Sequence, residues 1–566
     1  MFIYDFIKDG KKIIIWTRFV FKFMMLKKGN KMNTDFINTA HKLEKKSQKL
    51  IERLNLSFPV DNCIKENLLK NIRLSKDIPV GYDLLMKKLK SLNLKEWKKT
   101  KNENYFRANW NISSISEKVK NWREEPTEIN YNKIPLKEKK EIFDCFFRYD
   151  VYGESKRKKN TIHLSRGVND PNYFFPPAFV KAGLNVAAEN DWFGYSDSLG
   201  HRDTRGKIAQ LEQFRRNQKK CSAENTAVVQ GGTEGLNSLL SFISKLGNRQ
   251  KKCIVIVPTY APIIDVIGYY FKPEIYFLNR DYSFSMENII NGIDEKTAVV
   301  LFSIPHNPGG FSDIKKFLPV LQEKCARFGT YFIADEIMFD EKISPYLDPI
   351  KYKNLIVLAS YSKMYNIAGL KLGHILADAS FIDKFYRHAS TTYGSPPSFL
   401  YYTVSLTAFY EKAFLEKRKA AVPPELKGKI SDKSLLLQEF KIWRELIDLH
   451  IKFQNFVILS MIRKFNLEKY FDIFGLHDVS PNIIIRLKNS RQTAYELFLR
   501  ILNDCNVSVI PIECFVPPSH WPSDLRVTSA VKPCVLVEAF YDVLRCILRT
   551  KDIEWQGKRG EYDGKI

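Results

Sequence analysis

The sequence lacks the cysteine patterns that bind metals or build a disulfide framework. Its nine cysteines are scattered, and no two of them form a Cys-x-x-Cys pair or stand at a spacing typical of a zinc site. An odd, scattered set of thiols is typical of reduced cysteines in a cytosolic protein. The pattern therefore predicts a cytoplasmic protein that binds no metal.

The sequence also has no apolar run long enough to cross a membrane. The most apolar stretch near its start, residues 13–26, is interrupted by Arg18 and Lys22, whereas a span needs about 20 consecutive apolar residues. A positive start followed by apolar residues resembles a secretory signal, but the small residues of a cleavage site are missing. The role of residues 1–32 stays open between an amphipathic surface helix and sequence upstream of a later initiating methionine.

Neither a catalytic motif nor an internal repeat is found before residue 160, where positive charge is concentrated. The 566-residue chain has a formal charge of +26, and residues 1–160 hold 37 lysines and arginines against 20 aspartates and glutamates. A basic segment can attract nucleic acid or anionic membrane. We favour a compositional drift, because lysine is frequent throughout. Residues 33–158 carry apolar residues at helical spacing and predict a helical, basic extension.

Beyond residue 160, apolar strands alternate with helices, and polar residues follow the strands. This alternation predicts an α/β fold with a mostly parallel sheet and helices on both faces. In such sheets, ligands bind at the carboxyl ends of the strands. The expected strands are residues 227–229, 254–257, 299–304, 331–336 and 355–358.

Lys363 follows the last of these strands, in the segment Ser360-Tyr361-Ser362-Lys363. A lysine at the end of an apolar strand, with hydroxyl groups beside it and a glycine turn beyond it, is placed for chemistry rather than for solvation. Burial or neighbouring cations lower the pKa of a lysine amine and make it a nucleophile that can form a Schiff base. Lys363 is therefore the first candidate catalytic residue.

The order of these motifs resembles that of the class I and II aminotransferases, fold-type-I pyridoxal-phosphate enzymes similar to aspartate aminotransferase. The resemblance rests on five motifs between roughly residues 160 and 550. It implies an N-terminal arm and a large cofactor-binding domain over residues 159–390, and a smaller C-terminal α/β domain over residues 391–566. A long helix expected at residues 435–465 and a strand at residues 482–487 suit that second domain.

The resemblance implies pyridoxal 5′-phosphate as the cofactor, held by a Schiff base to Lys363. Asp335 matches the aspartate that pairs with the pyridine nitrogen, where a protonated ring withdraws electrons from the reacting carbon. A buried carboxylate that faces a cation stays ionised at neutral pH. Asn307 matches the residue that donates to the 3′-oxygen of the cofactor, and Tyr260 matches the aromatic residue that stacks on its ring.

The same resemblance assigns the phosphate of the cofactor to residues at a helix start and near the lysine. Gly232 and Thr233 would offer backbone N–H groups supported by the helix dipole, and Ser360 matches a phosphate-binding serine. Lys371 stands where the family usually has arginine, so the charge is kept but the bidentate fork is lost. Tyr195 matches a tyrosine that reaches the phosphate of the partner subunit, which implies a homodimer.

The substrate residues that the resemblance implies lie far apart in the sequence. Arg526 resembles the late arginine that binds the α-carboxylate of the substrate, for which a planar guanidinium is better suited than an amine. Gly167 would line that site, and Asn307 would border it. The departure that matters most is at Met338, which stands where the family has the tyrosine that donates to the 3′-oxygen; methionine cannot donate that bond.

We therefore expect a cytoplasmic pyridoxal-phosphate-dependent aminotransferase that acts on an amino acid and a 2-oxo acid. A lyase, decarboxylase or cyclase with the same residues stays open, because a fold does not determine a reaction. A transcription regulator with a basic DNA-binding head is a further alternative. It is disfavoured because no helix-turn-helix signature is found, and neither nucleic acid nor membrane is expected as a partner.

Overall fold

The computed structural model describes two helices near the start of the chain and most of the chain beyond residue 160. The described residues are 35–91 and 161–548, with gaps at 218–219, 247–250, 310–313, 339–342, 419–421, 465, 476–479, 489, 491 and 516–522. The predicted leader, residues 1–32, and the later part of the predicted extension, residues 92–158, lie outside them. Within the described residues, no helix is both long and apolar enough to cross a membrane.

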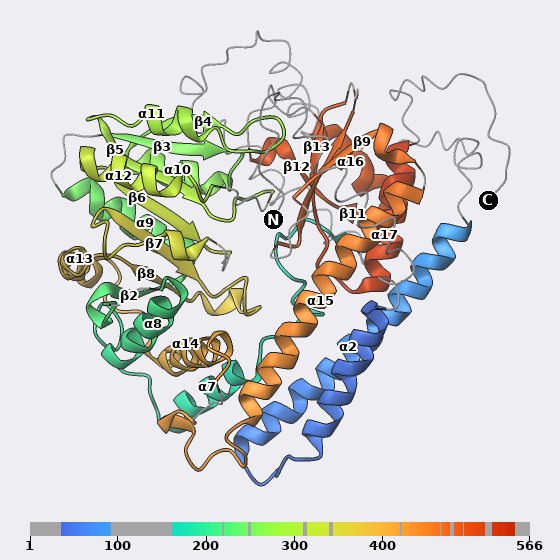
Figure 1. The fold of residues 1–566 in the computed structure, drawn as a ribbon, viewed down its shortest axis with the longest axis horizontal. Helices are drawn as coiled ribbons and strands as arrows, with labels where there is room; N and C mark the ends of the chain where they lie inside the picture. The colour runs from blue at the N-terminus through green and yellow to red at the C-terminus, as the bar shows by residue number, and fades with distance from the viewer. Residues whose placement is uncertain are drawn as a thin grey trace, which may run out of the picture.

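A seven-stranded sheet forms the centre of the larger lobe (Figure 1). Its strands lie in the order β2-β8-β7-β6-β5-β3-β4; β8 is antiparallel to both its neighbours, and the other pairs are parallel. The central strands are continuous apolar runs, as expected of a sheet covered on both faces. The strands are β2 (Thr226–Val229), β3 (Lys252–Val257), β4 (Lys272–Phe277), β5 (Thr297–Ser303), β6 (Tyr331–Glu336), β7 (Leu355–Ser360) and β8 (Gly373–Leu376).

Helices cover both faces of this sheet. Alternate residues of a strand belong to two separate apolar cores, one shared with helices α9 and α13 and the other with α7, α8, α12 and α14. The predicted α/β fold with a mostly parallel sheet is therefore confirmed. The helices of this lobe are α7 (Ala178–Glu189), α8 (Arg202–Arg215), α9 (Gly231–Lys245), α10 (Ala261–Tyr270), α11 (Met286–Asn291), α12 (Leu318–Phe328), α13 (Ala379–Thr392) and α14 (Tyr401–Leu415).

A four-stranded antiparallel sheet, in the order β12-β13-β10-β9, forms the smaller lobe. Helix α15 runs from the larger lobe to this one (Figure 1). A two-residue strand, β1, pairs in parallel with β11 and ties the chain before the large sheet to the smaller lobe. The elements are β1 (Ile162–His163), α15 (Leu435–Lys464), β9 (Phe471–Phe474), β10 (Asn482–Leu487), α16 (Ala494–Cys505), β11 (Val507–Ser508), β12 (Ile510–Pro511), β13 (Asp524–Thr528) and α17 (Pro533–Leu548).

The long helix and the strand at residues 482–487 lie where the sequence predicts them. Helix α14, which follows residue 391, packs on α7 and α8 of the larger lobe. The chain therefore returns to the larger lobe before α15 leaves it, and the division of the two domains at residue 391 stays a prediction.

Two N-terminal helices, residues 35–51 and α2 (Pro59–Ser91), lie along α15 and α17 (Figure 1). The ring of Phe36 packs on the rings of Phe453 and Phe456 at centroid distances of 5.6 and 5.5 Å. Asn67 Nδ2 donates to the buried Glu439 Oε1 at 3.2 Å. The helical part of the predicted extension is therefore confirmed for these residues.

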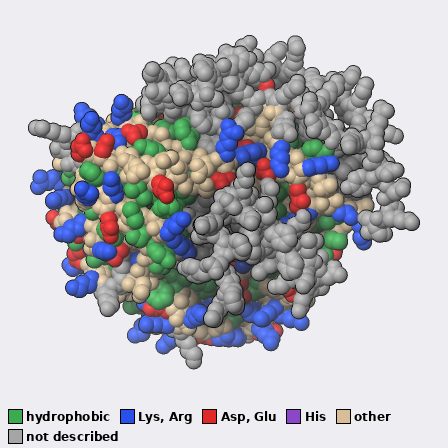
Figure 2. Space-filling model, turned by 45° about the horizontal axis from the view of Figure 1, so that its top comes forward, with side chains coloured by type: hydrophobic (Ala, Val, Ile, Leu, Met, Phe, Trp, Pro, Cys, Tyr) green, Lys and Arg blue, Asp and Glu red, His purple; other side chains and the backbone are tan. Residues whose placement is uncertain are grey.

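Basic side chains are spread over the face drawn in Figure 2 rather than gathered in one place, and acidic side chains lie among them. On this face the described residues therefore present charges of both signs. A surface of this kind is typical of a solvated protein surface.

Candidate active site

Asp335 is the next-to-last residue of strand β6 and pairs in register with Ser303 at the end of β5. Its Oδ2 accepts a hydrogen bond from Ser303 Oγ at 2.7 Å, and its Oδ1 accepts one from the backbone N–H of Ile337 at 3.1 Å. Burial raises the pKa of Asp335 to about 6, although these two bonds oppose the shift. Since both donors are neutral, the carboxylate is held in place without full compensation of its charge.

Lys363 follows β7, the next strand of the sheet, and its side chain is half-buried. Burial, together with the charges of Arg526 and Lys371, lowers the pKa of its amine to about 8, whereas the charge of Asp335 acts in the opposite direction. A larger fraction of the amine is therefore neutral near pH 7 than for an exposed lysine. The neutral amine is the form that acts as a nucleophile and as a base.

Arg526 lies in β13 of the smaller lobe and is only 4% exposed. One guanidinium nitrogen donates to Asn307 Oδ1 at 3.2 Å and another to the backbone oxygen of Ser165 at 2.7 Å. Its guanidinium also lies over the ring of Phe515, 5.0 Å from the centroid. Asn307 belongs to the larger lobe, so this contact joins the two lobes at the site.

Gly167 has a structural reason to be glycine. Its φ is +66°, and a Cβ atom there would approach the guanidinium of Arg526 to 2.8 Å. Its backbone N–H donates to Thr528 Oγ1, two residues beyond Arg526, at 2.9 Å. The segment around Gly167 therefore lies directly against the guanidinium.

The residues predicted to bind phosphate meet around the first turn of α9, which contains Gly232 and Thr233. Gly231 has a φ of +82°, and a Cβ atom there would lie 3.6 Å from the backbone of Lys371. A Cβ atom on Gly232 would have Ser360 Cβ 3.9 Å away. Free N–H groups at a helix start attract anions, and here Ser360 and the backbone of Lys371 lie beside them.

Two aromatic residues from the prediction lie at the surface. Tyr260 precedes α10, and 36% of its area is exposed. It lies close enough to Arg526 to raise the pKa of the guanidinium, which burial lowers. Tyr195 is fully exposed, and Phe193 beside it is 66% exposed. The structure therefore brings Tyr260 to the site of its own chain, whereas Tyr195 projects into solvent.

Sequence reasoning missed Ser303, although its place at a strand end was a usable signal. It also missed a buried ionic network behind the site. In this network Arg216 pairs with Glu336, the neighbour of Asp335, and with Glu212 at 2.9 Å. Arg215 reaches Glu411 at 3.5 Å, and Glu411 accepts from Tyr365, two residues after Lys363, at 2.9 Å. The members of the ionic network are Glu212, Arg215, Arg216, Glu336, Tyr365, His374 and Glu411.

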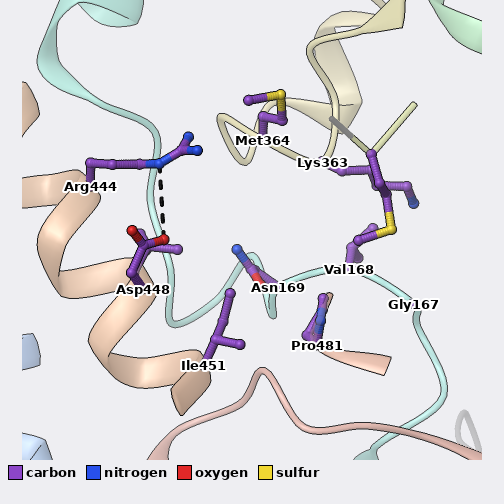
Figure 3. A pocket seen from close by; sticks show the side chains of 11 residues that line it. Gly167, Val168, Asn169, Lys363, Met364, Arg444, Asp448, Ile451 and Pro481 are labelled. Atoms are coloured by element: carbon purple, nitrogen blue, oxygen red, sulfur yellow. Dashed lines mark ion pairs between the residues drawn. The ribbon is translucent and has the colours of Figure 1, made fainter. Parts of the chain in front are cut away.

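An open cleft extends from Lys363 towards α15 (Figure 3). Gly167 and Met338 also line it. Across the described residues, no cluster of three or more histidine, cysteine or acidic side chains is placed to bind a metal.

Comparisons with known proteins agree with this architecture. Residues 161–540 match the model of the family described as aminotransferase class I and II. The chain is 22% identical over 263 residues to an aspartate aminotransferase of Sulfurisphaera tokodaii, which covers 44% of this chain and 64% of the relative. It is 25% identical over 239 residues to an arginine–pyruvate transaminase of Pseudomonas aeruginosa, which covers 41% and 60%. The chain thus matches less than two thirds of the length of these relatives.

Solved structures show the same fold. The aspartate aminotransferase of Thermotoga maritima superposes with a TM-score of 0.56 at 18% identity, over 73% of this chain and 97% of that one. An Escherichia coli protein with a methionine aminotransferase function superposes with a TM-score of 0.56 at 16% identity, over 69% and 94%. At these identities the likeness concerns the fold.

Proposed function

Since the chain belongs to the class I and II aminotransferase family, we propose that it transfers an amino group between an amino acid and a 2-oxo acid. The observation that carries the proposal is that Asp335 and Lys363 lie at the ends of neighbouring strands of the larger lobe, close enough to Arg526 of the smaller lobe for its charge to lower the pKa of Lys363. A nucleophilic amine, a buried carboxylate and a carboxylate-binding guanidinium are the groups that such a reaction needs.

The residues present fit pyridoxal 5′-phosphate. Asp335 is buried with neutral hydrogen-bond donors and a raised pKa, which suits a carboxylate that faces a protonated pyridine nitrogen. The start of α9, with Gly232, Thr233 and Ser360, and with Lys371 beside it, would bind the phosphate. When bound, the cofactor would supply a sink for the electrons left on the α-carbon.

Lys363 Nζ would hold the cofactor covalently and, once the substrate amine has replaced it, would remove the proton from the α-carbon and deliver it to the acceptor carbon. Its pKa of about 8 lies near neutral pH, where proton transfer in both directions is effective. Arg526 would orient the α-carboxylate, while Asn307 would hold both the guanidinium and the cofactor.

The test of this function is the fate of the amino group. With ¹⁵N-labelled amino acids and 2-oxoglutarate or pyruvate as acceptor, the label is expected in the new amino acid. Release of the label as ammonia, or loss of the carboxylate as carbon dioxide, would instead support the lyase or decarboxylase alternative on the same residues.

We further propose that the enzyme is cytoplasmic, because all eight described cysteines are free thiols. Reduced thiols are typical of proteins in a reducing compartment. Seven of them lie in the two lobes rather than in the N-terminal helices.

The exposure of Tyr195 supports a homodimer in which it completes the phosphate site of the partner. Tyr195→Ala and Lys363→Ala subunits are each expected to be nearly inactive. When they are mixed, half of the dimers are hybrids with one intact site, so about a quarter of the wild-type activity is expected to return. No recovery after verified subunit exchange, or a fully active monomer in sedimentation, would contradict the role.

Met338 leads to a spectroscopic prediction. A phenol at this position would donate to the 3′-oxygen of the cofactor and stabilise its anionic form, which methionine cannot do. In Met338→Tyr, the pH midpoint of the bound-cofactor absorbance is therefore expected to fall by roughly one to two units. Met338→Leu adds no donor and serves as the matched control. Equal midpoints for the wild type and Met338→Tyr would show that another residue already fills the donor role.

A further inference from the structure

The cleft between Lys363 and α15 is lined by residues next to those assigned to the substrate. Its lining includes Lys363, Met338 and Gly167, and Gly167 touches the guanidinium of Arg526. Among the described residues that line it, none belongs to the phosphate group around the start of α9. The cleft therefore continues from the place where the α-carbon and the α-carboxylate of a substrate would lie.

One stripe of helix α15 forms the far wall of the cleft (Figure 3). Arg444, Ile447, Asp448 and Ile451 are spaced at i, i+3, i+4 and i+7, so they lie on one face of the helix. The two isoleucines are 5% and 6% exposed. This wall thus combines two apolar side chains with one pair of opposite charges.

Two methionines form the opposite side of the cleft. Met338 follows β6, and Met364 follows Lys363 directly; both line the cleft and are only partly buried. Methionine side chains are flexible and polarizable, so they adapt to apolar groups of different shape. Between them and the isoleucines, an apolar side chain would have contacts on both sides.

The polar side chains of the far wall, and Asn169, have partners within the chain. Arg444 Nε lies 3.9 Å from Asp448 Oδ1, and these side chains are 18% and 48% exposed, so the pair lies towards solvent. Asn169 Nδ2 donates to Asn366 Oδ1 at 2.7 Å. A side-chain carboxylate of a substrate in this space would lie beside Asp448 as well as Arg444. Because Arg444 already pairs with Asp448, it would not compensate for the lost hydration of the substrate carboxylate.

We propose that the amino-acid substrate of this enzyme has a long, uncharged and mainly apolar side chain, which lies in the cleft between the two methionines and the two isoleucines. The inference rests on the proposed aminotransferase function and specifies its substrate class. Methionine, leucine and phenylalanine fit this description, whereas aspartate and glutamate do not.

The first test is the rate of amino transfer from five L-amino acids by the cofactor-loaded full-length protein. The value of kcat/KM is expected to be roughly 100-fold higher for methionine, leucine or phenylalanine than for aspartate or glutamate. Aspartate or glutamate as the best donor would overturn the inference and leave the aminotransferase function standing. A lack of transfer from all five would overturn both.

The second test changes an apolar side chain in the wall of the cleft. Ile451→Ala is expected to lower kcat/KM for methionine roughly tenfold. Leu449→Ala, on another face of the same helix, is the matched control and is expected to leave it unchanged. Equal losses in both variants would overturn the inference, because they would show a general effect on α15.

Asp448→Asn keeps the shape of the side chain, and Asp448 is half exposed, so folding is expected to be preserved. The variant removes the carboxylate that offsets Arg444 in the cleft. The value of kcat/KM for glutamate is therefore expected to rise roughly tenfold, while that for methionine stays within about threefold. An unchanged preference against glutamate would show that the cleft does not receive the substrate side chain.

Discussion

Replacing Lys363 by alanine is expected to abolish turnover and the covalent attachment of the cofactor. The variant loses both the nucleophile and the proton carrier, and a general base alone contributes roughly 10²–10⁴-fold to a rate. Borohydride reduction of the wild-type holoenzyme, followed by peptide mapping, is expected to place the cofactor on Lys363. A label on any other lysine would contradict the assignment.

Two controls separate lost chemistry from lost folding. Lys384→Ala removes an exposed lysine from α13 and is expected to leave the rate unchanged. In Lys363→Ala, the apoprotein is expected to unfold at a temperature equal to or above that of the wild type, because the removed amine is desolvated, with a lowered pKa. An early loss of structure in this variant would mean that its inactivity reports folding instead.

Replacing Asp335 by asparagine is expected to leave cofactor binding partly intact but to remove most of the proton transfer at the α-carbon. Asparagine is neutral and does not hold the pyridine nitrogen protonated, so the electron sink is weakened. Loss of one such charge interaction costs about 3–4 kcal/mol in the transition state, or roughly 10²–10³-fold in rate. The measurement is exchange of substrate α-deuterium, and a near wild-type exchange rate would contradict the role.

Although Asp335→Asn is expected to lower the rate, it is not expected to lower the stability of the apoprotein at pH 8. Since burial raises the pKa of Asp335 to about 6, the folded state binds its proton more tightly than the unfolded state. This contribution to stability is present at low pH and is lost as the pH rises from about 4 to 6. At pH 8 the apo form of Asp335→Asn is therefore expected to be at least as stable as the wild type. Strong destabilisation would show that Asp335 is a structural residue.

Much of the fold follows from apolar runs that are easy to recognise. The strands at residues 331–336 and 482–487 have the predicted bounds, because each contains a run of apolar residues bordered by polar ones. β4 and β8 were not predicted. β4 is an edge strand in which lysine, proline and glutamate interrupt the pattern, whereas β8 has only four residues and follows a glycine turn.

The site was predictable where a strand end carried the residue and not where contacts cross the chain. Asp335 and Lys363 meet because the parallel strands β6 and β7 end at the same edge of the sheet. The hydrogen bond between Arg526 and Asn307 joins residues 219 positions apart in the sequence. Local sequence patterns do not show which residues that far apart come into contact. The α15 stripe had a visible helical spacing, but the spacing alone did not show that one face lines a cleft.

The ionic network behind the site has a consequence for how the chain acquires its structure. Its carboxylates and guanidinium groups come from the end of α8, from β6 and from α14, segments that lie far apart in the sequence. Although burial alone would raise it, Arg216 and Arg215 hold the pKa of Glu212 below its ordinary value, and removing one partner from a buried pair costs about 3–5 kcal/mol. A chain in which only some of these segments have docked therefore carries uncompensated charge in its interior. Partly folded forms of the chain are therefore destabilised. The larger lobe and the residues behind the site are expected to fold together in one cooperative transition.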